Sequence, residues 1–73
     1  GDFARACPKL GQSLRLDPAP GAALALALCR EREGKLSSAV TAYELATRLA
    51  RASGDEERAT AAEARAKRLI SLL

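Results

Sequence analysis

The apolar residues of this chain are almost all alanine and leucine. These two residue types account for 29 of the 35 apolar residues, and the chain has only one valine, one isoleucine, one phenylalanine and one tyrosine. β-Strands favour β-branched and aromatic residues, whereas alanine and leucine are among the best helix formers. The composition therefore predicts an all-α fold. Because an alanine side chain buries little area, the helices must approach each other closely.

The length of 73 residues allows one small hydrophobic core. Four helices are expected, at about residues 2–16, 20–33, 37–52 and 55–72, separated by segments rich in Pro, Gly, Ser and Asp. Asp2 and Asp55 are in position to cap the first and fourth helices, and Ser37 or Ser38 the third. Pro8 indicates that the first helix either begins late, near Cys7, or bends.

The longest apolar run is Ala22 to Cys29, which ends at Arg30. It is far shorter than the ~20 residues that span a bilayer, so no membrane insertion is expected. The chain begins at Gly1 without a cationic and apolar leader. These features favour a soluble piece of a longer protein and a cytoplasmic location.

The charged residues are spread evenly along the chain, with a formal net charge of +3. A nucleic-acid interface concentrates basic charge on one face and adds aromatic side chains that stack on bases. Neither feature is present, and a nucleic-acid site would have to rely on Arg58, Arg65 and Arg68. We therefore expect no nucleic-acid partner.

The two cysteines stand in a chain that has no histidine. Two thiols without another soft ligand do not complete a structural zinc site. Free cysteine is among the most buried residue types, so Cys7 and Cys29 are expected to be buried thiols in a reducing compartment. A disulfide between them is the alternative.

No residue pattern indicates catalysis. The acidic residues lie beside basic ones or at helix starts, Ser37 and Ser38 have no histidine to activate them, and Gly34 stands outside any phosphate-binding loop. The sequence therefore predicts no catalytic, cofactor-binding or metal-binding residue, no cofactor and no enzymatic activity.

An internal repeat organises the chain. A shift of 33 positions superposes similar residues, and a period between 20 and 50 residues is typical of stacked repeats. In each copy, small, large and small apolar residues at i, i+4 and i+7 share one helix face. The superposed pairs are Gly1 with Gly34, Phe3 with Leu36, Ala6 with Ala39, Leu10 with Tyr43, Ser13 with Ala46, Arg15 with Arg48 and Leu16 with Leu49.

These residues resemble the tetratricopeptide repeat (TPR), whose unit is two antiparallel helices in about 34 residues. The resemblance covers roughly residues 1–50. The sequence departs from the family pattern at Ala23, Arg30 and Arg51, which replace Trp, Tyr and Pro. It implies a larger bacterial protein in which residues 1–18 are the second helix of a truncated repeat, 19–52 one complete repeat and 53–73 a C-terminal capping helix. A coiled-coil segment is the alternative for the last part. The best-matched positions are Leu26, Ala27, Gly34, Ala39, Tyr43 and Ala46.

The resemblance also implies a function. The first helix of each TPR repeat lines a concave groove, and Leu24, Ala25 and Leu28 lie where some members carry a carboxylate clamp, so that clamp is missing. We expect a non-catalytic interaction module that docks an apolar helix or an extended peptide with a polar end. The residues assigned to the groove are Gly21, Leu24, Leu28, Glu31 and Arg32.

A structural role is the alternative function. The leucines of the second helix would then pack on a neighbouring repeat or on a second copy of the chain. In that case the protein is a self-association element, a homodimer without a peptide ligand.

Overall fold

The structure is a computed structural model that describes residues 2–73. Gly1, which the repeat aligns with Gly34, lies outside the described residues. The predicted all-α fold is confirmed: the described part of the chain contains four helices and no strand. They are α1 (Phe3–Leu16), α2 (Pro20–Arg32), α3 (Leu36–Ala52) and α4 (Glu56–Ile70).

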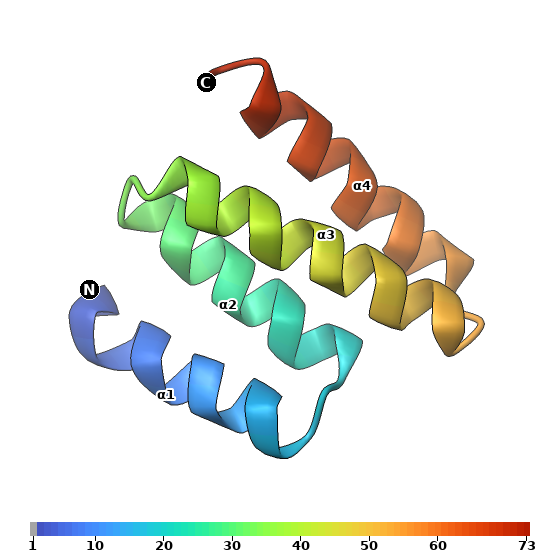
Figure 1. Cartoon of the computed structure of the whole chain (residues 1–73), viewed down its shortest axis with the longest axis horizontal. Coiled ribbons are helices and arrows are strands. Elements are labelled where there is room, and N and C mark those ends of the chain that lie inside the picture. The colour runs from blue at the N-terminus through green and yellow to red at the C-terminus, as the bar shows by residue number, and fades with distance from the viewer. Residues whose placement is uncertain (1) are drawn as a thin grey trace.

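The four helices lie side by side in chain order, and each runs antiparallel to the one before it (Figure 1). Each helix packs mainly against its neighbours in the sequence. The molecule measures 32 × 31 × 15 Å between its Cα atoms, and a helix with its side chains is about 10–12 Å across. The helices therefore form a thin layer with two broad faces.

The turns that follow α2 and α3 have the same geometry. Gly34 and Gly54 have φ angles of 79° and 80°, a left-handed conformation that L side chains rarely adopt. In each turn the glycine N–H donates to the carbonyl three residues back, and the next N–H donates to the carbonyl five residues back. These are the two bonds of a Schellman motif, which satisfies carbonyl groups at a helix end.

The helix starts follow the sequence with two exceptions. Asp2 occupies the cap position of α1, but its side chain makes no capping hydrogen bond. α2 begins at Pro20, as expected, because the fixed φ of proline suits the first helical position. Asp55 caps α4 by accepting a hydrogen bond from the Arg58 N–H at 3.0 Å. The expectation that Ser37 or Ser38 caps α3 is wrong, because Leu36 is already helical and Lys35 occupies the cap position.

Pro8 lies inside α1, which begins at Phe3 rather than near Cys7. Proline has no N–H, so it cannot donate to the carbonyl of Ala4, four residues back. Gly11, another weak helix former, follows three residues later. α1 is therefore the helix with the least intrinsic stability.

The core is built mainly of alanine around one large side chain, Tyr43, which is fully buried. The repeat positions Ala39, Tyr43 and Ala46 share one face of α3 with Ala50, and all four are fully buried. Leu73 lies beyond the end of α4 at Ile70 and is 66% exposed. The other fully buried alanines are Ala23, Ala27, Ala59 and Ala62.

The left-handed glycines give a stability prediction. A Cβ added to Gly34 or Gly54 meets no atom within 4 Å, so the penalty of an alanine there is conformational alone. We expect Gly34→Ala and Gly54→Ala each to lower the free energy of unfolding by about 1–2 kcal/mol. Urea titration followed by circular dichroism measures the change.

Gly11→Ala is the matched control. Gly11 also has open space around its Cα atom, but it lies inside a helix with ordinary φ. Alanine there should raise the free energy of unfolding by up to about 1 kcal/mol. Equal effects at Gly11 and Gly34 would contradict the conformational explanation.

Candidate binding surface

The five residues predicted to line a groove all lie on α2, but the structure does not bring them together. Leu28 and Arg32 line a groove between α1 and α2. Leu24 packs against the core, and Glu31 is half-buried and contacts α3. Gly21 is exposed and lines neither region. The predicted residues therefore do not form one continuous site.

The groove between α1 and α2 has a volume of about 280 Å³. Its lining is apolar except at Arg32, which is exposed. None of the ion pairs within residues 2–73 involves Arg32. The guanidinium group of Arg32 is therefore available to a ligand. The lining residues are Phe3, Ala6 and Leu10 of α1 and Ala25, Leu28, Cys29 and Arg32 of α2.

A disulfide bond between Cys7 and Cys29 joins the two helices of the groove. The expectation of two free thiols is therefore wrong. The Cα atoms of the two cysteines are 5.7 Å apart, within the range that a disulfide spans. Both cysteines are buried, and Cys29, which is 6% exposed, also lines the groove.

The sequence contains a signal for this disulfide. Cys7 lies ten residues before Asp17 and Cys29 ten residues after Ala19, the two ends of the linker between α1 and α2. In an antiparallel helix pair, residues equally far from the turn lie at the same level. The expected helix boundaries were sufficient to place the two cysteines opposite each other.

Phe3, Ala6 and Leu10 are the groove residues that sequence reasoning missed as a site. They recur along one face of α1, at i, i+3 and i+7. The resemblance assigned the groove to the second helix alone, so the contribution of α1 to the lining was not expected.

Tyr43 and Glu31 form a polar contact on the other side of α2. The Tyr43 hydroxyl donates a hydrogen bond to the Glu31 carboxylate at 2.8 Å. Burial raises the pKa of Tyr43 above its ordinary value of 10.0, and the hydrogen bond and negative charge of Glu31 raise it further. Arg65 of α4 acts in the opposite direction. This contact ties α2 to α3 and explains why Glu31 is not free to meet a ligand.

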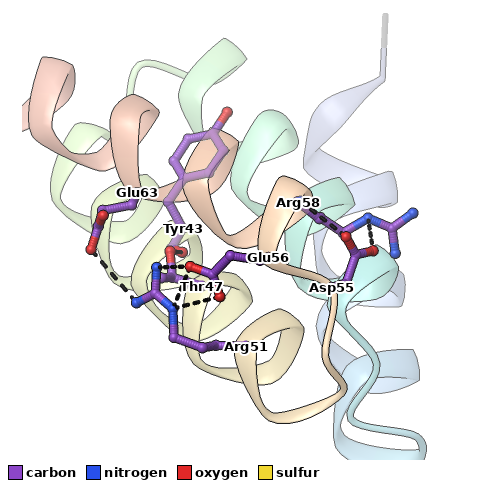
Figure 2. A network of polar contacts seen from close by, with 7 residues as sticks. All are labelled: Tyr43, Thr47, Arg51, Asp55, Glu56, Arg58 and Glu63. Carbon is purple, nitrogen blue, oxygen red and sulfur yellow. Dashed lines mark hydrogen bonds and ion pairs between the residues drawn. The ribbon is translucent and has the colours of Figure 1, made fainter.

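A second hollow lies between α3 and α4, where Arg51 binds two carboxylates (Figure 2). One Arg51 nitrogen lies 3.1 Å from a Glu56 oxygen, and another lies 3.8 Å from a Glu63 oxygen. The hydrogen bond to Glu56, and then its charge, raise the pKa of Arg51. The hollow has a volume of about 430 Å³ and is lined mostly by charged side chains of both signs, of which Arg51 and Glu63 pair with each other. It therefore offers little continuous apolar surface to a ligand. Its lining consists of Glu44, Thr47, Arg48, Arg51, Glu63, Ala66, Lys67 and Ile70.

Two further observations concern the part of the chain that the structure describes. No three His, Cys, Asp or Glu residues in it are placed to hold a metal ion. Among its helices, none has the length and apolar character needed to cross a membrane. Comparison with protein-family models, with curated proteins and with solved structures gives no match.

Tyr43 gives a prediction for alkaline pH. Because its pKa is raised in the folded state, the folded protein holds its proton at a pH where the unfolded chain has lost it. The contribution of protonated Tyr43 to the free energy of unfolding is complete below about pH 10. It is lost as the pH rises from there through the pKa of Tyr43 in the folded state. Urea titrations between pH 8 and pH 11 measure this loss.

Tyr43→Phe is the control, because it keeps the buried ring and removes only the hydroxyl group. At pH 8 we expect it to lower the free energy of unfolding by about 1 kcal/mol, the value of one hydrogen bond. The loss of stability above pH 10 should be smaller in this variant. If the free energy of unfolding of this variant falls above pH 10 as steeply as that of the wild type, the loss of stability comes from groups other than Tyr43.

Proposed function

We propose that the protein is a non-catalytic interaction module that docks a short peptide segment of a partner protein. The observation that carries this proposal is the apolar groove between α1 and α2, which ends at the free guanidinium group of Arg32. Its volume lies just below the 300–1,000 Å³ of typical small-molecule pockets. It fits one or two apolar side chains of a peptide better than a cofactor.

The chemistry of the groove defines the peptide. Phe3, Leu10 and Leu28 offer an apolar surface to leucine-like or aromatic side chains. Arg32 favours an acidic residue beside them, because an arginine forms bidentate hydrogen bonds with a carboxylate. The proposed ligand is therefore an apolar segment with an acidic residue at one end.

We further propose that the chain is TPR-like and belongs to a larger bacterial protein. Breaks between helices fall at Asp17–Ala19 and Ser53–Asp55, which supports a division into 1–18, 19–52 and 53–73. The burial of Ala39, Tyr43 and Ala46 also supports it, because these are positions where the sequence resembles the repeat.

The disulfide bears on the location of the protein. Disulfides persist in oxidising environments and are rare in the cytosol. The Cys7–Cys29 disulfide is buried between α1 and α2, which supports an oxidising environment for the folded protein. We propose an oxidising compartment, which for a bacterial protein is the periplasm or the cell exterior.

A peptide-display experiment tests the docking function. A library of random 12-residue peptides is selected on the immobilised oxidised protein, and enriched peptides are measured by fluorescence polarisation. We expect them to combine apolar residues with an acidic one. Leu28→Ser should weaken their binding at least tenfold, because it removes about 1.5–3 kcal/mol of apolar contact.

Two further variants sharpen the test. Leu16→Ser is the matched control, because Leu16 is 80% exposed and lies outside the groove, so binding should not change. Arg32→Glu should shift the selected peptides from acidic to basic. Failure to enrich any peptide, or equal effects of Leu16→Ser and Leu28→Ser, would reject the docking function.

Self-association is the second candidate, and exposed apolar residues at the end of α4 favour it. Ile70, Leu72 and Leu73 are each about half exposed or more. If they mediate a homodimer, sedimentation equilibrium between about 1 and 100 μM will show a concentration-dependent mass. The double variant Ile70→Ser/Leu72→Ser should then remain a monomer. A wild-type monomer over this whole range would reject the dimer.

A further inference from the structure

α1 has little intrinsic tendency to remain helical. It has 14 residues, and isolated helices of 12–15 residues are marginal in water even with favourable composition. Pro8 removes one backbone hydrogen bond from its interior, and Gly11 weakens it further. The order of α1 must therefore come from its contact with the rest of the molecule.

That contact is small apart from the disulfide. α1 packs mainly against α2, and its buried residues are Cys7 and Leu14. Among the residues that the structure describes, Leu14 is the only one of α1 in the main core cluster, whose other members belong to α2, α3 and α4. The disulfide is thus the principal connection that holds α1 in place, whereas α2, α3 and α4 share a core of their own.

We propose that the Cys7–Cys29 disulfide is a redox-sensitive clasp for α1: reduction releases this helix from α2 and dismantles the apolar groove, while α2, α3 and α4 stay folded. The release removes Phe3, Ala6 and Leu10 from the groove and uncovers the face of α2 around Ala25 and Cys29. This inference goes beyond the docking function and holds whether or not the groove binds a peptide.

The chemical step is thiol–disulfide exchange with a dithiol reductant. A thiolate of the reductant attacks the sulfur of Cys29, the cysteine that lines the groove, and Cys7 leaves as a thiolate that takes up a proton. The second thiol of the reductant then displaces Cys29. The reductant is oxidised to its disulfide, and its two electrons and two protons end on the thiols of Cys7 and Cys29.

The expected effect follows from the loop that the disulfide closes. The two cysteines are 22 residues apart. Removing the crosslink across a loop of this length raises the population of the open state, in which α1 is released, by about three-hundredfold in the chain-entropy description. We therefore expect amide exchange in α1 to accelerate by about that factor on reduction, with little change in α3.

Hydrogen exchange of the full chain, measured by mass spectrometry with and without dithiothreitol, tests the proposal. Trypsin provides a second readout, because Lys9 and Arg15 become cleavable when α1 is released. Helical ellipticity should fall by about a quarter, the share of helical residues that α1 contributes. Unchanged exchange in α1 after complete reduction would overturn the proposal. Acceleration throughout α3 and α4 would also overturn it, since the disulfide would then support the whole fold.

Two variants separate the disulfide from side effects of the reductant. Cys7→Ser/Cys29→Ser without dithiothreitol should show the same fast exchange confined to α1, and dithiothreitol should not alter it. Pro8→Ala restores a backbone donor at an exposed position of α1 and should slow the exchange of the reduced form. The peptide-binding test uses the oxidised protein, so its failure would leave the exchange result unaffected.

Discussion

The close approach of alanine faces is the constraint on which the rest of the structure depends. Ala23 and Ala27 of α2, Ala39 and Ala46 of α3 and Ala62 of α4 belong to one core cluster and are fully buried. Alanine loses no side-chain entropy when it is buried, but each contributes little apolar area. The helices must therefore pack closely along their length, with Tyr43 filling the space that alanine leaves.

Most of the fold could be predicted from the sequence, because helix propensity and the breaks between helices indicate the same elements. Gly34 and Gly54 marked two helix ends, and Pro20 and Asp55 marked two starts. The start of α3 was less predictable, because the Gly34 turn brings the chain into the helix at Leu36, before the serines that suit a cap. Local rules left open whether the first helix begins near Cys7 or continues through Pro8, and the structure shows that it continues.

The candidate site was predictable only in part. Spacing along α2 placed Leu28 and Arg32 on an accessible surface, but it could not show that Glu31 binds the hydroxyl of Tyr43, since that contact depends on how α2 packs on α3. The preference of free cysteine for burial is a general rule that does not distinguish a thiol from a disulfide, whereas the pairing of Cys7 with Cys29 depends on the antiparallel arrangement of the two helices. The Glu31 contact belongs to the tertiary arrangement, which period and composition do not contain, whereas the helix boundaries expected from the sequence already place the two cysteines opposite each other.

The three linkers of the molecule are equally long but not equivalent. Two are glycine turns whose hydrogen bonds fix the next helix, whereas Asp17–Ala19 has no left-handed glycine. The disulfide between Cys7 and Cys29 fixes how α1 is aligned along α2. At the other two linkers the glycine turn fixes the alignment of the two helices. A Schellman turn in place of Asp17–Ala19 would fix the backbone between α1 and α2 as it does at the other two linkers, and it offers a protein engineer a route to a cysteine-free version of the same layer.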